Sequence, residues 1–171
     1  MGRIIAFGRK KPKIHKSAYI DPTAVIIGDV TIMENVSVWP LSVIRADEEK
    51  ITIGNDSAIL DHVLIEAPKN NPVEIGEKVI VSHCAALHGC KVGDKSLIGV
   101  GSIVLDGAII ESECIIGAGA VVPPHTKVPK RALMLGVPAK QVREVSEKEI
   151  KMIINEIIKI QRKAKKYVQK I

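Results

Sequence analysis

A period of six residues runs through most of the chain. From position 86 onward every sixth residue is apolar, namely Ala86, Val92, Ile98, Val104, Ile110, Ile116, Val122 and Val128. A helix needs a spacing of 3.6 residues and a two-faced strand a spacing of two, so neither produces this period. Tandem short repeats are typical of solenoids, whose units bury their apolar faces only by stacking on one another.

The same period starts earlier and is interrupted twice. It is kept by Ile20, Ile26, Ile32, Val38 and Ile44, and again by Ile53, Ile59 and Ile65. The register slips around residues 46–50, and a second irregularity falls at residues 68–74. We therefore expect an all-β solenoid, a parallel β-helix of hexapeptide repeats, over residues 14–135.

A three-sided coil with one hexapeptide on each side takes about 18 residues, so residues that far apart should stack, as with Ile98 and Ile116. One apolar side chain from each side would fill a narrow interior, which suits a chain with one Trp, two Tyr and one Phe. The pairs Gly28-Asp29, Gly54-Asn55 and Gly93-Asp94 are expected at corners, where these residues tolerate positive φ.

The pattern changes after Arg143. Residues 146–149 read Ser-Glu-Lys-Glu, which is typical of a capping box at a helix start. The apolar residues then fall at helical spacing: Ile150, Ile153, Ile154, Ile157, Ile158 and Val168. We expect an amphipathic helix over 146–170, covering either its own solenoid or a neighbour's, within a single domain of residues 1–171.

The net charge of +6 comes largely from the two ends of the chain. No aromatic or Arg cluster accompanies these lysines, so we expect neither a nucleic-acid nor a membrane partner. No apolar run is long enough to cross a membrane, which favours a cytoplasmic protein. The cysteines Cys84, Cys90 and Cys114 lack the C-x-x-C spacing of zinc ribbons and are expected to be small buried residues. Cys84 and Cys90 lie near two histidines, which leaves a metal or redox role for them open.

Candidate chemistry clusters around the two irregular segments. Glu66 and His88 are 22 residues apart, which is one coil plus an insertion of about four, so they should occupy equivalent places on successive coils. His83 precedes His88 by five residues, about 16 Å of extended chain, and can join them only from a neighbouring subunit. Two imidazoles and one carboxylate are a common ligand set for catalytic zinc.

The residues alone leave other readings open. The two histidines can equally satisfy backbone carbonyl groups or line an interface between subunits. Arg45 and Asp47, which open the first irregular segment, can form an ordinary ion pair. Spacing does not decide between these roles and a metal site.

Several segments resemble the γ-class carbonic anhydrase family of left-handed β-helix proteins. They comprise residues 28–30, 36–40, 43–47 with Arg45 and Asp47, 53–55, Asp61, His83, 88–94 and 136–140. The resemblance implies a homotrimer with three zinc sites between subunits (iron or cobalt also occur), each held by three histidines. His83 and His88 match two of them, His83 being the neighbour's contribution.

The resemblance also implies an activity and roles for the remaining residues. The activity is the reversible hydration of carbon dioxide to bicarbonate by metal-bound hydroxide, a lyase reaction. Arg45 and Asp61 match a pair that links the site to the interface, and Asp47 matches the acidic partner of Arg45. Glu48, which follows Asp47, matches a residue that takes part in proton transfer.

Three positions depart from the family. Its first histidine ligand falls on Glu66, its glutamine on Leu60 and its asparagine on Ala58. A carboxylate donates more charge to the metal than an imidazole, so the bound water should be less acidic. We expect a metal site of His83, His88 and Glu66 (Zn²⁺, or Fe²⁺ or Co²⁺) with lowered or absent activity.

Two other functions stay open at this point. One is a non-catalytic trimeric scaffold or binding protein of the same family. The other is a hexapeptide acyltransferase, with His83, His88 or His125 as the general base.

Overall fold

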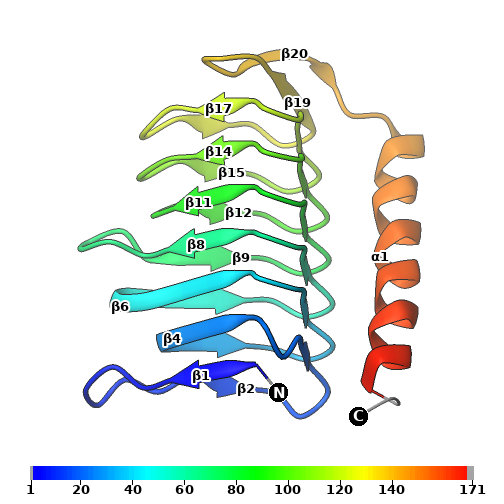
Figure 1. The fold of residues 1–171 in the computed structure, drawn as a ribbon. Helices are drawn as coiled ribbons and strands as arrows, with labels where there is room; N and C mark the ends of the chain where they lie inside the picture. The colour runs from blue at the N-terminus through cyan, green and yellow to red at the C-terminus, as the bar shows by residue number, and fades with distance from the viewer. Residues whose placement is uncertain (1, 169–171) are drawn as a thin grey trace.

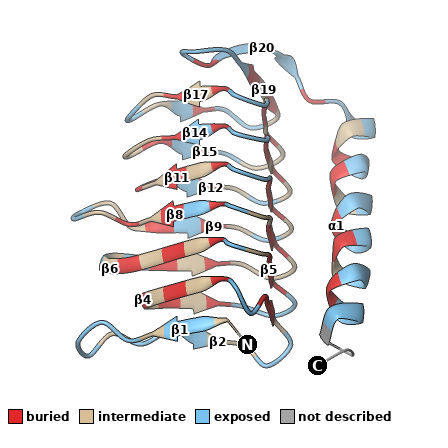
Figure 2. Cartoon of the chain, viewed as in Figure 1, coloured by how far each residue is buried: buried red, intermediate tan, exposed pale blue. Residues whose placement is uncertain are grey.

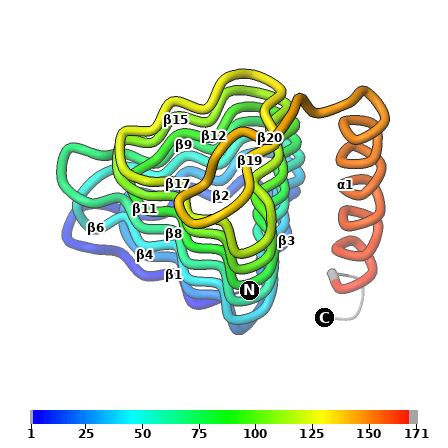
Figure 3. The backbone as a smooth tube through the Cα atoms, turned by 90° about the horizontal axis from the view of Figure 1, so that it is seen from above, coloured from blue at the N-terminus to red at the C-terminus, as the bar shows by residue number. Residues whose placement is uncertain are grey.

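The computed structural model describes residues 2–168 and confirms a left-handed parallel β-helix with one C-terminal helix. The chain winds into stacked three-sided coils, and the helix α1 lies along one side of the stack (Figure 1). Seen along the axis, the coils superimpose into a tube with α1 beside one face (Figure 3).

Two faces of the tube share a 12-stranded sheet. The long strands β4 (Val25–Ile32) and β6 (Val43–Ile53) run across the corner between these faces. The first face further holds β1 (Arg3–Ile5), β8 (Leu64–Glu66), β11 (Ala86–His88), β14 (Ile103–Val104) and β17 (Val121–Val122). The second holds β2 (Lys13–Ile14), β9 (Val73–Ile75), β12 (Lys91–Val92), β15 (Ile109–Ile110) and β18 (Lys127–Val128).

The third face is an eight-stranded sheet. It consists of β3 (Tyr19–Ile20), β5 (Ser37–Val38), β7 (Ala58–Ile59), β10 (Ile80–Val81), β13 (Leu97–Ile98), β16 (Ile115–Ile116), β19 (Ala132–Leu135) and β20 (Lys140–Glu144). β20 runs antiparallel to β19, with an irregularity between Leu133 and Met134. At the other end β1 already pairs with β4, so the strands start before the expected residue 14.

The six-residue period marks the interior of the tube. Ile98 stacks on Ile116 in the expected register, and both are fully buried. Position 86 is an exception, because Leu87 rather than Ala86 fills the interior and pairs with Val104. This coil is one residue shorter than the others, so counting backward by six from Val92 misses the inward residue.

The corners follow the expected Gly-Asp and Gly-Asn pairs only in part. Gly28 has a φ of 81°, but in the other two segments the positive φ falls one position later, on Asp56 and Lys95. Gly54 has a different role, since a Cβ there would lie 2.6 Å from the backbone carbon of Gly76 on the next coil. Its missing side chain permits the close approach of two coils.

Helix α1 (Glu147–Val168) begins at the expected capping box. The Ser146 N–H donates to the Glu149 carboxylate at 2.9 Å, and the Ser146 hydroxyl oxygen accepts from the Glu149 N–H at 3.3 Å. The expected helix extends to residue 170, and its last two positions lie outside the described residues.

The apolar stripe of α1 packs on the third face of its own solenoid (Figure 2). The residues in this contact are Ile153, Ile157, Ile160 and Ala164 from α1, with Tyr19, Trp39, Ala58 and Ile80 from the wall. The prediction that Ile158 belongs to this apolar stripe is wrong, because this residue is 40% exposed. Tyr19 and Trp39 thus lie outside the tube, whose interior holds aliphatic side chains.

Two smaller expectations can be compared with the structure. Cys90 and Cys114 are buried as expected, whereas Cys84 is exposed. Within residues 2–168, no helix combines the length and the apolar character needed to cross a membrane.

Candidate metal centre

Arg45, Glu66 and His88 form a column on the first face. They occupy the same register position on β6, β8 and β11, so Glu66 is the direct partner of both neighbours. This confirms that Glu66 and His88 are equivalent residues on successive coils. The loop between β8 and β9 holds the extra residues that lengthen their spacing to 22.

The two carboxylate oxygens of Glu66 face different partners. Oε1 contacts the guanidinium of Arg45, which also donates to Asp47 Oδ2 at 2.9 Å. Hydrogen bonding to Glu66 first, and then to Asp47, raises the pKa of Arg45 above its ordinary value. Oε2 lies 3.9 Å from Nε2 of His88, too far for a hydrogen bond.

This separation fits two ligands of one small cation. With metal–ligand bonds of about 2.0–2.1 Å, tetrahedral ligand atoms lie about 3.3 Å apart. The Glu66 oxygen and the His88 nitrogen are only slightly farther from each other, and their side chains are 24% and 37% exposed. A single chain offers no complete set, because residues 2–168 contain no cluster of three or more His, Cys, Asp or Glu side chains suited to a metal.

Asp106 is a neighbour of His88 that the sequence reasoning missed. Its Oδ1 atom contacts Nδ1 of His88 from the next coil. The signal was available, since the expected step of 18 residues from His88 ends at Asp106, although β11 and β14 pair one residue closer than that step. The pKa of the Cys90 thiol is raised to about 12, mainly because the thiol is buried and secondly because the Asp106 carboxylate is nearby.

His83 lies in the corner before β11, whereas His88 ends that strand. The two histidines are therefore at opposite ends of one face, and the chain does not bring them together. Nδ1 of His83 is 3.0 Å from Asp61 Oδ2, so a carboxylate holds this imidazole too.

Asp61 and His83 border a groove between α1 and the wall of the solenoid. The groove has a volume of about 480 Å³. Its lining includes Leu60, Trp39 and Leu97 from the wall and Met152 and Ile153 from α1. Leu60, in the position of the family's glutamine, thus contributes an apolar side chain here, while Ala58 is buried under α1.

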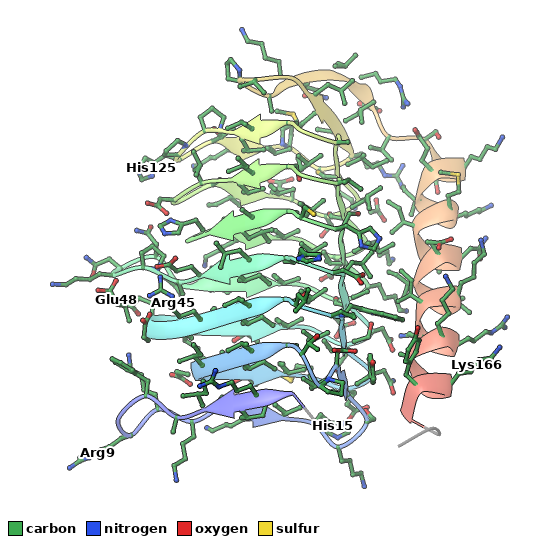
Figure 4. All side chains as sticks on the ribbon, in the orientation of Figure 1. Arg9, His15, Arg45, Glu48, His125 and Lys166 are labelled. Carbon is green, nitrogen blue, oxygen red and sulfur yellow. The ribbon has the colours of Figure 1, made fainter. Side chains whose placement is uncertain are left out.

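Asp47 and Glu48 lie within the long strand β6. Figure 4 shows Glu48 on the side of the solenoid away from α1. Lys10 Nζ donates to the carbonyl oxygen of Asp47 at 3.0 Å and also to that of Glu48. The Glu48 carboxylate accepts from the backbone N–H of Lys69 at 2.8 Å. Within one chain Glu48 therefore binds the neighbouring loop rather than the Glu66–His88 pair.

Comparison with known proteins gives consistent matches over most of the chain. The family model described as bacterial transferase hexapeptide (six repeats) matches residues 11–46 and 89–124. Gamma carbonic anhydrase 2, mitochondrial, of Arabidopsis thaliana is 34% identical over an alignment of 165 residues, and the match covers 93% of this chain and 57% of that protein. The chain thus spans little more than half the length of this plant relative.

Two further proteins match over most of their own length. Protein YrdA of Escherichia coli (strain K12) is 42% identical over an alignment of 145 residues, and the match covers 81% of this chain and 79% of that protein. The crystal structure of a hexapeptide transferase family protein from Anaplasma phagocytophilum has a TM-score of 0.93 at 30% identity, covering 96% of this chain and 98% of that one.

Proposed function

The chain belongs to the γ-carbonic anhydrase-like family of hexapeptide-repeat proteins, and we propose that it is a metal-binding homotrimer whose carbon dioxide hydration is slow. Each site would lie between two subunits. Glu66 and His88 of one subunit and His83 of the next would hold the metal, which we take to be zinc, with iron or cobalt as substitutes.

The pairing of Glu66 with His88 is the observation that carries this proposal. Oε2 and Nε2 face each other at a distance suited to two ligands, on strands whose register is set by the coil. His83 lies in the corner before β11 with a side chain that is 52% exposed, so it is available to a neighbouring subunit. Carboxylates contact Nδ1 of both imidazoles, which leaves Nε2 of each for a metal.

The residues around the site explain why hydration should be slow. A bound zinc ion would supply Lewis acidity that lowers the pKa of water. Glu66 brings a negative charge where a neutral imidazole would not, and Arg45 neutralises part of it through Oε1. Leu60 and Ala58 offer no polar group to orient water or bicarbonate, so this chain's contribution is to bind rather than to activate.

Subunit mixing tests the arrangement directly. His83→Ala and His88→Ala homotrimers should each lose zinc, because each lacks one ligand at every site. Trimers reassembled from an equal mixture contain one intact interface in each mixed trimer, so on the order of a quarter of the sites should return. The measurement is bound zinc per chain by elemental analysis after removal of free metal.

The control is His15→Ala, because His15 lies outside the column and should leave the zinc content unchanged. Zinc that survives either single substitution would contradict the ligand set. A trimer that binds no zinc would favour the scaffold function instead, and a monomer in analytical ultracentrifugation would contradict any site shared between subunits.

Acyl transfer is a second candidate, favoured by two observations. The groove beside His83 is large enough for a small acyl group, and a hexapeptide transferase family protein shares the fold. Acetyl-CoA binding measured by calorimetry tests it. Binding that His83→Ala abolishes would support acyl transfer, and the lack of any binding would remove this candidate.

A further inference from the structure

The corner after β14, on the coil next to His88, holds a carboxylate for which the proposed ligand set has no role. We infer that Asp106 is a positioning residue that fixes the ring of His88 so that Nε2 faces the metal. This inference rests on the proposed metal site, and it adds to that site a residue that touches neither metal nor substrate.

The backbone around Asp106 is arranged to present its carboxylate to the coil below. The Gly107 N–H donates to the carbonyl oxygen of Gly89 at 2.7 Å, and the His125 N–H donates to that of Asp106 at 2.8 Å. These bonds tie the residue to the coils on both sides. Figure 4 shows His125 on the same side of the solenoid as Arg45, away from α1.

Gly89 clears the path between Asp106 and His88. A Cβ at position 89 would lie 2.9 Å from Oδ1 of Asp106, the same atom that contacts His88 Nδ1. Gly89 also has a φ of 56°, which a residue with a side chain adopts only with strain. A side chain at this position would crowd both Asn71, whose Cβ would lie at 2.7 Å, and the carboxylate of Asp106.

The chemistry of the contact sets the state of the imidazole. An ionised carboxylate only accepts hydrogen bonds, so Nδ1 of His88 must carry the hydrogen. Nε2 of a neutral ring then has its lone pair free, and this atom is the one that faces Glu66 Oε2. Asp61 makes the same contact with Nδ1 of His83, so both proposed imidazole ligands are held alike.

The alternative is that Asp106 merely ties two coils together. Asp94 provides a matched control, because its Oδ1 accepts from the backbone N–H of Glu77 on an adjacent coil at 2.9 Å and contacts no histidine. If both carboxylates served only the solenoid, Asp106→Ala and Asp94→Ala would lower the melting temperature alike and leave His88 unaffected.

The first measurement uses metal-free protein. Nitrogen-15 NMR, recorded at a pH where the ring is neutral, distinguishes the two imidazole tautomers. We expect the Nδ1–H form for His88 in the unmodified protein and in Asp94→Ala, and a shift toward Nε2–H in Asp106→Ala. Asp106→Asn keeps a neutral acceptor and should fall between them. An Nε2–H ring in the unmodified protein would overturn the inference.

The second measurement is zinc affinity, determined by competition with a chelator. Loss of a residue that orients a metal-binding histidine typically weakens affinity about 10- to 100-fold, and we expect this loss for Asp106→Ala but not for Asp94→Ala. Equal affinities in the two variants would overturn the role of Asp106 while leaving the metal site intact. If the unmodified protein binds no zinc, the proposed function fails, and the tautomer still decides whether Asp106 orients the ring.

Discussion

Nε2 of His88 lies 3.9 Å from Oε2 of Glu66 on the preceding coil. The distance is set by the solenoid, because the two residues are direct register partners on adjacent parallel strands. A metal bound between these atoms, as proposed, would have one carboxylate oxygen and one imidazole nitrogen as ligands from this chain.

Replacing Glu66 by histidine should raise carbon dioxide hydration. Glu66→His removes the negative charge that opposes the acidity of the reacting water, and Arg45 keeps Asp47 as a partner. If the pKa of that water falls by about one unit, the fraction present as hydroxide at a pH below the pKa rises about tenfold. We therefore expect the hydration rate to rise about tenfold. Stopped-flow assays of zinc-loaded protein provide the measurement, with Glu74→His on the second face as the control. A rate that does not change would contradict the argument.

The cysteines should react in a fixed order. Burial raises the pKa of Cys90 to about 12, and burial also raises that of Cys114, whereas Cys84 is exposed. Because the thiolate is the reactive form, iodoacetamide at pH 8 should modify Cys84 first. Peptide mass spectrometry over a time course measures this order, and Cys84→Ser should abolish the early product. Early modification of Cys90 would contradict the burial of Cys90 in the corner between β11 and β12.

Two isoleucines test the interior. Ile98→Ala empties a fully buried position and should lower the free energy of unfolding by about 2–5 kcal/mol. Ile109→Ala makes the same chemical change at a residue that is 39% exposed, and it should cost less than about 1 kcal/mol. Urea denaturation followed by circular dichroism compares them. Similar losses would mean that the two positions do not differ in burial in solution.

The start of α1 should make stability depend on pH. The guanidinium of Arg143, followed by Ser146, holds the pKa of Glu149 well below its ordinary value. A lowered pKa stabilises the folded state above the unfolded value of about 4.3, and this contribution is lost as the pH falls toward the lowered pKa.

Glu149→Gln should therefore cost about 1 kcal/mol at pH 7, as for other helix caps, and progressively less below pH 4. Denaturation curves at pH 7, 4 and 3 measure the difference from the unmodified protein. A difference that stays constant over this range would show that the charge of Glu149 contributes nothing.

The interior of the fold was predictable because the coil has a strict period. Stacking by 18 residues placed Ile98 on Ile116, and allowing for one insertion placed Glu66 on His88. The same arithmetic failed at Leu87, where one coil is a residue short, because a single deletion leaves the apolar pattern almost unchanged.

The surroundings of the site were less predictable. Asp106 lies 18 residues after His88, one residue beyond the register step between β11 and β14. Contact with Nδ1 also requires a corner that turns the carboxylate toward the preceding coil and the absence of a side chain at Gly89. The contact of the Glu48 side chain could not be predicted either. Its bond to the Lys69 N–H depends on the conformations of the irregular part of β6 and of the loop before β9. Repeats set the backbone, whereas interruptions of the repeat set where polar side chains point.

The antiparallel strand at the C-terminal end of the stack has a consequence for the behaviour of the protein in concentrated solution. A parallel solenoid could in principle elongate without limit, because its last coil displays unpaired amide and carbonyl groups that suit another molecule's first coil. β20 covers the β19 edge in the opposite direction, its residues Lys140, Arg143 and Glu144 are charged and exposed, and a bulge distorts its pairing. End-to-end growth into fibrils is thereby disfavoured at that end by the same chain segment that leads into α1.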